Sequence, residues 1–231
     1  MIYNSNIILL IVIGVIGMVV QSRLQYVFSK YSKVMFSGGM TGKDVAEKML
    51  RDNGIYDVKV THVAGRLTDH YNPRTKTVNL SDAVYNSNSV AAAAVAAHEC
   101  GHALQHAVGY APLKMRSALV PLTQFSSQWS FLFLLGGIGL MYWADMPQLA
   151  WVFWVGIGML CCAALFSIVT LPVEYNASHR ALAWLENQHI LSREGQAQAR
   201  TALMWAARTY LVAAIASVAT IVYYLGFARR D

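Results

Sequence analysis

Long apolar segments constrain this chain most, because the apolar interior of a bilayer admits only helices and closed barrels. Residues 7–20 hold no charged side chain and, with their flanks, approach the roughly 20 residues that a transmembrane helix needs. Only 13% of all residues are charged and 56% are hydrophobic, whereas about 25% are charged in a typical soluble domain. Further apolar segments occupy residues 131–143, 149–171 and 210–227. We therefore predict a mainly α-helical, polytopic membrane protein with about four transmembrane helices.

A polar stretch with mixed secondary-structure signals separates the first two apolar segments. Thr41 begins a short amphipathic helix, and Asn53 and Gly54 end it. Residues 55–63 alternate loosely and predict a strand. Residues 72–75, which include a proline, predict a hairpin turn between two further short strands. We expect a small α+β domain here, with a strand beside which an extended peptide could pair.

The motif HECGH at residues 98–102 lies in a segment that favours helix, because residues 90–97 are all Ala or Val. Asn88 or Ser89 can cap the start of that helix. In a helix, the two histidines of an HExxH motif lie one turn apart on the same face, where they can bind one Zn²⁺ ion. The glutamate between them is placed to accept a proton from water. The segment therefore predicts a zinc site with His98 and His102 as ligands and Glu99 as the catalytic base.

A catalytic zinc ion commonly has three protein ligands, so the motif needs a partner. His106 is excluded, because it lies about 12 Å from His98 along a helix that rises 1.5 Å per residue. The HExxHxxGxxH pattern also fails, since its Gly and His positions are filled by Gln105 and Val108. The remaining candidates are downstream carboxylates. Glu174 is preferred over Glu186 and Glu194, because it follows the third apolar segment directly, after Pro172, which we expect to end that helix.

Three motifs together resemble a known family. The segment HECGHALQH, with LTDHYNPRTKTVNLS before it and LPVEYNASHRAL after it, is similar to the YugP-like neutral zinc metallopeptidases of bacterial membranes. The resemblance covers roughly residues 1–228 and implies a gluzincin-like, zincin-type domain. It also implies that His98, His102 and Glu174 are the Zn²⁺ ligands and that Glu99 is the base. Gluzincins often carry an Asp where this chain has Ser178, so the resemblance assigns no role to that position.

Several other polar residues are candidates for supporting roles in the site. A peptidase must stabilise an oxyanion in the transition state, and a ligating histidine is commonly oriented by a further acceptor. Asp69 is the candidate for orienting a ligand. The candidates for the oxyanion group are His70, Tyr71, His179 and Arg180. His62, His106 and His189 are interpreted as ordinary surface or interface residues.

The distribution of positive charge predicts the orientation of the chain. Nearly all Lys and Arg residues follow the first and third apolar segments, which predicts that the HExxH domain lies in the cytoplasm. The resemblance to the bacterial family implies that the membrane is the inner membrane of a bacterium. Four spans would put Arg229 and Arg230 on the other side, against this rule, so the side of the C-terminus stays open. The predicted parts are a first transmembrane helix (1–22), the HExxH-bearing part (38–118), a transmembrane hairpin (129–171), a helical segment with the third ligand (172–208) and a last transmembrane helix (209–228).

The sequence therefore predicts a membrane-anchored zinc endopeptidase that hydrolyses membrane or membrane-proximal polypeptides. Its expected partners are the polypeptide substrate, the lipid bilayer and other membrane proteins, and no nucleic acid, because the net charge of +6 is not clustered. One alternative is an intramembrane protease of the site-2 type, although no later apolar segment has an LDG-type Asp motif. The other is a membrane scaffold or assembly factor with a structural metal, which would need a fourth protein ligand such as His179.

Overall fold

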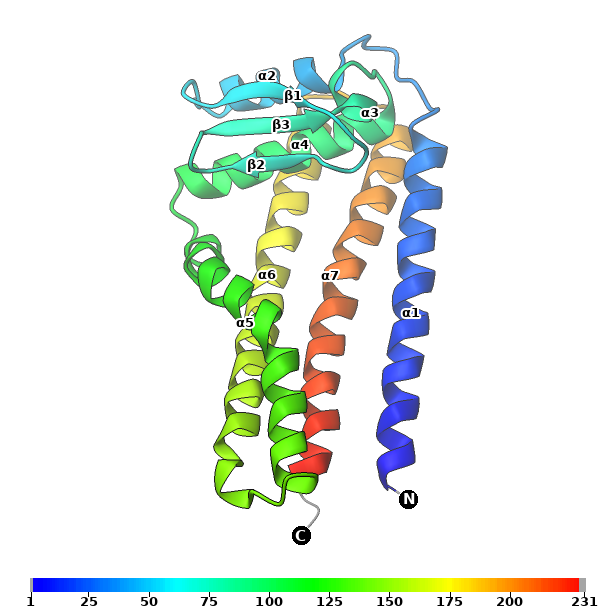
Figure 1. Cartoon of the computed structure of the whole chain (residues 1–231). Helices are drawn as coiled ribbons and strands as arrows, with labels where there is room; N and C mark the ends of the chain where they lie inside the picture. The colour runs from blue at the N-terminus through cyan, green and yellow to red at the C-terminus, as the bar shows by residue number, and fades with distance from the viewer. Residues whose placement is uncertain (1, 229–231) are drawn as a thin grey trace. The chain divides into compact units, whose positions relative to one another are not determined.

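The computed structural model describes residues 2–228, and the side chains of residues 7–226. Within that range the chain is mainly helical, as predicted, with one small sheet (Figure 1). The helices are α1 (Ile2–Tyr31), α2 (Gly42–Asp52), α3 (Asp82–Tyr85), α4 (Val90–Ala107), α5 (Ala111–Tyr142), α6 (Trp151–Asn187) and α7 (Arg193–Ala228), with a 3₁₀ turn, η1, at Pro147–Leu149. The strands are β1 (Lys59–Val63), β2 (His70–Asn72) and β3 (Thr77–Ser81). Arg229 and Arg230 lie outside the described residues.

The chain forms two compact units. The helical unit consists of the residues up to Val19, Met115–Leu171 and the residues from Thr209 on. The sheet-bearing unit consists of Val20–Lys114 and Pro172–Arg208. Because helices α1, α5, α6 and α7 each contain residues of both units, one continuous helix can have an apolar part in the first unit and a functional part in the second.

The sheet has the strand order β1-β3-β2, in which β1 runs parallel and β2 antiparallel to β3. The β2–β3 pair, with Tyr71 opposite Val78, is the predicted hairpin. The first strand covers only the last part of the predicted segment 55–63. Side chains alternate along a strand, and Val78 and Leu80 of β3 are therefore buried on one face of the sheet. Helices α2 and α4 pack against β3 and lie behind the sheet in Figure 1.

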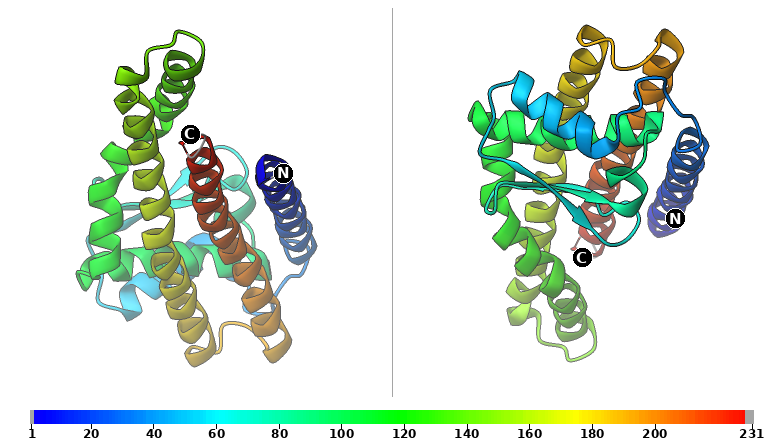
Figure 2. Two further views of the ribbon diagram at one scale, coloured as in Figure 1. Left: turned by 90° about the horizontal axis from the view of Figure 1, so that it is seen from below. Right: turned by 90° about the horizontal axis from the view of Figure 1, so that it is seen from above.

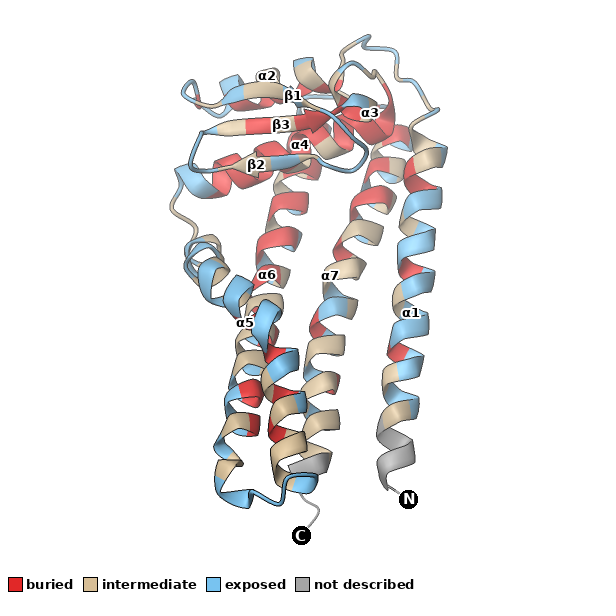
Figure 3. Cartoon of the chain, in the orientation of Figure 1, coloured by how far each residue is buried: buried red, intermediate tan, exposed pale blue. Residues whose placement is uncertain are grey.

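Side-chain caps fix the first turns of the two helices that pack against the sheet. Thr41 and Asp44 form a capping box at α2, which begins and ends as predicted. Ser89, one of the two predicted caps, accepts a hydrogen bond of 3.2 Å from the Ala92 N–H at the start of α4. Because alanines are small, α4 lies close to its neighbours, and residues 91–94, 96 and 97 are fully buried in the core of the sheet-bearing unit. Many of the residues coloured as buried in Figure 3 belong to this core and to the adjoining part of α6.

Three helices of the described residues are long and apolar enough to cross a membrane. They correspond to Ile7–Tyr31, Pro147–Asn187 and Arg193–Gly226. They contain the first, third and fourth predicted spans. The predicted span at 131–143 lies in α5, which does not reach the same hydropathy, so a fourth transmembrane helix stays a prediction.

The prediction that Pro172 ends a helix is wrong. Pro172 lies inside α6, which continues for 15 further residues to Asn187. Proline removes one backbone donor and costs about 3 kcal/mol in a helix interior. In α6 the residues after Pro172 bury a regular stripe of side chains, including Val173, Ala177 and Ala181, in the sheet-bearing unit. We attribute the continuation of the helix to this burial, which supplies stability that the local sequence lacks.

Candidate metal centre

Helices α4 and α6 bring two histidines and one glutamate together in the sheet-bearing unit. The Nε2 atoms of His98 and His102 lie 3.3 Å and 3.6 Å from the same oxygen, Oε2 of Glu174. The Glu174 side chain is only 3% exposed. The other two downstream carboxylates, those of Glu186 and Glu194, are exposed. The structure thus joins the HExxH motif to the carboxylate that the sequence favoured.

The donor atoms of this cluster suit a zinc ion. Ligating atoms of the three side chains all lie within 4.8 Å of one another. Nitrogen and oxygen ligands bind zinc at about 2.0–2.2 Å, so two donors in a tetrahedral site are separated by about 3.4 Å. The two Nε2–Oε2 distances, 3.3 Å and 3.6 Å, are close to that separation. Among the described residues this group has three ligating side chains and no fourth, which fits a site that keeps one position open.

Gly101 permits the close approach of the two helices that carry the cluster. A Cβ atom at this position would lie 2.6 Å from the backbone oxygen of Ala177 and 3.0 Å from its Cα. Neither backbone atom can move without shifting α6. Since Gly101 lies within the HExxH motif and Ala177 lies three residues after Glu174, this contact controls the distance between the two halves of the site.

Each motif histidine also has a hydrogen-bond partner on its other ring nitrogen. Nδ1 of His102 lies 3.1 Å from Oε1 of Gln105, and Nδ1 of His98 lies 3.1 Å from Oγ of Ser178. A side-chain amide oxygen only accepts, so His102 donates its Nδ1 proton to Gln105. The same assignment for His98 makes the Ser178 hydroxyl an acceptor. When the two rings are neutral, this tautomer leaves the lone pairs of both Nε2 atoms facing Glu174 and available to a metal ion.

The Gln105 side chain is held by α6. Its Nε2 group donates to the Val173 carbonyl at 2.8 Å and to Oδ1 of Asn176 at 3.0 Å. The same Asn176 oxygen accepts a 2.8 Å hydrogen bond from Nε of Arg180. Gln105 is completely buried, so these bonds determine which way its amide points. Arg180, an oxyanion candidate from the sequence, is thus placed at the end of a hydrogen-bonded chain that reaches His102.

The electrostatics of the cluster favour positive charge on His102. Burial alone would lower the pKa of this imidazole. The hydrogen bond and charge of Glu174 oppose that effect, the Glu99 charge adds to them, and the pKa of His102 is raised overall. Glu99 is itself 8% exposed. The carboxylates of Glu99 and Glu174 therefore both lie close to the buried His102 side chain. Two negative charges in one small buried region attract a cation.

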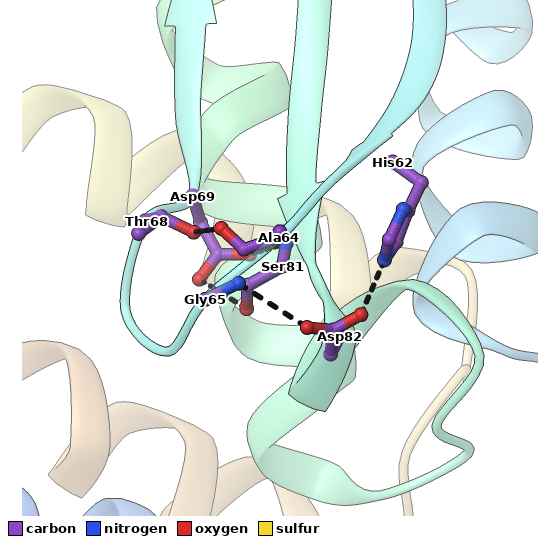
Figure 4. Close-up of polar contacts among 7 residues, drawn as sticks. All are labelled: His62, Ala64, Gly65, Thr68, Asp69, Ser81 and Asp82. Carbon is purple, nitrogen blue, oxygen red and sulfur yellow. Dashed lines mark hydrogen bonds and ion pairs between the residues drawn. The ribbon is translucent and has the colours of Figure 1, made fainter.

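The other sequence candidates lie mainly around the sheet. Both oxygens of Asp69 accept hydrogen bonds from Ser81, at 2.7 Å from its N–H and 2.9 Å from its hydroxyl, as Figure 4 shows beside the His62–Asp82 pair. Burial raises the pKa of Asp69, and this effect outweighs the hydrogen bonds from Ser81, which lower it. Among the described residues the acceptors next to the motif histidines are therefore Gln105 and Ser178, whereas Asp69 stabilises the turn before β2.

The oxyanion candidates have different surroundings. The Tyr71 hydroxyl lies 2.8 Å from Nδ1 of His106, where both side chains line a cavity of about 460 Å³. Nδ1 of His70 lies 2.8 Å from the Thr68 carbonyl oxygen, and His70 is exposed. His179 is exposed as well. A fourth ligating histidine, which the structural-metal alternative needs, is thus not part of the buried cluster.

Sequence reasoning missed four residues that shape this centre: Gln105, Asn176, Ser178 and Gly101. Two of them, Gln105 and Ser178, had a signal in the sequence. Gln105 is a polar residue three positions after His102, which places the two side chains beside each other on a helix. Ser178 lies four positions after Glu174 and is its neighbour on a helix for the same reason. Gly101 carried no separate signal, because its role depends on where α6 passes.

These features define a class: a helical protein with candidate membrane spans and a largely buried His-His-Glu group, built on an HExxH helix, that could hold a metal ion. The chain belongs to the family described as "Putative neutral zinc metallopeptidase", which it matches over residues 6–229. It is also 39% identical over 198 residues to "Putative membrane protease YugP" of Bacillus subtilis (strain 168), covering 86% of this chain and 85% of that protein. These findings confirm the resemblance inferred from the three motifs. No solved structure matches the chain.

Proposed function

We propose that this chain is a membrane-anchored zinc endopeptidase that hydrolyses peptide bonds of membrane or membrane-proximal proteins. The observation that carries the proposal is the buried cluster of His98, His102 and Glu174 directly beside Glu99. Family membership supports it independently.

In the proposed site His98, His102 and Glu174 hold one Zn²⁺ ion. When bound, the ion acts as a Lewis acid and lowers the pKa of water, which makes water a nucleophile near neutral pH. Gln105 and Ser178 keep the two imidazoles in the tautomer that presents Nε2 to the ion. The protein thus supplies ligands that are already oriented before the metal arrives.

Glu99 is the proposed proton carrier. Its carboxylate accepts a proton from the attacking water while the water oxygen bonds to the carbonyl carbon of the peptide. It then delivers that proton to the amide nitrogen as the C–N bond breaks, so the products are one carboxylic acid and one amine. The oxyanion of the tetrahedral intermediate needs a donor, for which Tyr71, His70, His179 and Arg180 are the candidates.

The proposed active site faces the cytoplasm of a bacterial cell, at the inner membrane. The support is the sequence rule that Lys and Arg concentrate on that side, together with the many basic residues between 23 and 76. A cytoplasmic site in a chain that is anchored by apolar helices favours substrates that are themselves membrane-bound or lie near the bilayer.

The test compares wild type with Glu99→Gln and with Glu186→Gln, an exposed glutamate of the same helix as Glu174 that serves as the matched control. Zinc content is measured by elemental analysis, and proteolysis with casein and with a membrane-protein extract. We expect zinc in all three proteins and proteolysis in wild type and Glu186→Gln only. Equal proteolysis by Glu99→Gln would contradict the proposed mechanism, and absence of zinc from the wild type would contradict the metal site.

A further inference from the structure

Two arginines from distant parts of the sequence lie around one tryptophan in the sheet-bearing unit. The guanidinium carbon of Arg208 lies 4.2 Å from the centre of the Trp205 ring, and that of Arg23 lies 5.9 Å from it. Arg23 also lies 5.1 Å from the Tyr26 ring centre. Both arginines are three residues from their aromatic neighbours, which is the spacing of adjacent side chains on a helix. We call Arg23, Tyr26, Trp205 and Arg208 the arginine–tryptophan cluster.

Carboxylates do not neutralise the arginine–tryptophan cluster. Residues 1–43 and 195–230, which include all of its members, contain no Asp or Glu. The ion pairs among the described residues involve Lys and His, and neither cluster guanidinium takes part in one. Arg23 and Tyr26 are exposed, and Trp205 and Arg208 are partly exposed. The cluster therefore presents two positive charges to whatever anion its surroundings offer.

The position of the cluster in the sequence indicates what those surroundings are. Arg23 follows the apolar segment 7–20 by three residues. Arg208 precedes the apolar segment 210–227 by two. Both segments belong to helices that are long and apolar enough to cross a membrane. On each helix the cluster thus marks the end of the apolar surface, where tryptophan and tyrosine concentrate in membrane proteins and where lipid head groups lie.

We propose that the arginine–tryptophan cluster binds the phosphodiester head group of an anionic phospholipid. A guanidinium offers a planar fork of donors that matches two phosphate oxygens, and stacking on an aromatic ring fixes its plane. Arg208, at 4.2 Å from the ring centre, is held in this way by Trp205. Arg23 approaches the same ring from α1, so a phosphate between the two would link α1 to α7. This site is separate from the metal centre and does not depend on peptidase activity.

The test uses the full-length protein in detergent and native mass spectrometry. It is titrated with dioctanoyl phosphatidylglycerol, with dioctanoyl phosphatidylcholine, and with phosphatidylglycerol in the presence of inorganic phosphate. Arg23→Gln/Arg208→Gln removes both charges, and Arg200→Gln is the control, because Arg200 is an exposed arginine of α7 outside the cluster. Each arginine near a membrane surface contributes about a fivefold gain in affinity for anionic lipid.

We expect tighter binding of phosphatidylglycerol than of phosphatidylcholine, a loss of roughly 25-fold in the double variant, and no change with Arg200→Gln. Unchanged binding by the double variant would overturn the site. Equal binding of the two lipids would overturn its charge recognition, and displacement by equimolar inorganic phosphate would overturn the assignment to a lipid. If the double variant does not fold, the two single variants decide the question, each with an expected loss of about fivefold.

Discussion

The two parts of α6 differ in the side chains that they expose and in the polar side chains that they bury. In the helical unit, its large apolar residues Trp151, Trp154, Leu165 and Ile168 are between 48% and 57% exposed. In the sheet-bearing unit, the same helix buries Glu174 to 2% and Ser178 to 9%. A helix that exposes large apolar residues in one part and buries a carboxylate in the other has two different surroundings along its length. The first part fits a lipid environment, and the second part fits a folded domain that compensates each buried polar group.

The two parts of α6 differ most at the buried carboxylate of Glu174. We expect its replacement to have the largest effect, which is the loss of zinc binding. Glu174→Gln keeps the size of the side chain but removes the charge that neutralises the site. We expect the purified variant to retain no zinc after dialysis, because the remaining two imidazoles do not complete a three-ligand site. Elemental analysis measures this, with Glu186→Gln as the control that keeps its metal. Full zinc occupancy of Glu174→Gln would remove this residue from the site.

A charge in the first part of α6 tests whether lipid surrounds it. Leu165 is 48% exposed, and an arginine near the centre of a membrane helix costs about 2.5–3.5 kcal/mol on insertion scales. We expect Leu165→Arg to lower the amount of protein in the membrane fraction, whereas Glu186→Arg, at an exposed position of the second part, leaves it unchanged. Similar amounts of the two variants would mean that the parts do not differ in solvent.

Two glycines in helices test how closely the site is packed. Alanine in place of glycine favours a helix by up to about 1 kcal/mol, and Gly158 of α6 has open space around it. We expect Gly158→Ala to raise the melting temperature. Gly101→Ala has the same local benefit, but its Cβ would lie 2.6 Å from the Ala177 oxygen, and overpacking costs about 1–3 kcal/mol. We therefore expect a lower melting temperature and weaker zinc binding, and a rise in both would contradict the close approach of α4 and α6.

The smallest effect concerns the partners of the histidines. Loss of an outer hydrogen bond to a ligating histidine weakens metal binding by 10–100-fold in general. We expect Ser178→Ala to fall near the lower limit, about tenfold, because a hydroxyl is a weak acceptor. Ser178→Thr keeps the hydroxyl and should restore zinc affinity in a chelator competition. Equal affinities of Ser178→Ala and the wild type would mean that Ser178 does not orient His98.

Much of the local structure was predictable because its causes are local. The short helix that begins at Thr41, the α4 helix with its Ser89 cap and the hairpin at residues 72–75 were all confirmed. The end of a helix at Pro172 was not, since burial of the residues that follow decides whether the helix continues. The sequence also did not predict that β1 pairs with β3 in parallel. The local pattern of a strand does not determine which other strand it pairs with, or in which direction.

The sequence by itself determined the chemistry of this protein: which residues can bind a metal, which segments are apolar, and where the positive charges lie. The spacing of the HExxH motif places its two histidines on one face of a helix, whatever that helix packs against. The tertiary structure decided the rest. The sequence preferred Glu174 among three carboxylates, but only the packing of α4 on α6 through Gly101 brings it to the histidines. The same packing supplies Gln105 and Ser178 as partners for the histidines. Contacts between residues some 70 positions apart depend on how two helices pack against each other. No local sequence pattern determines the distance between the axes of those helices.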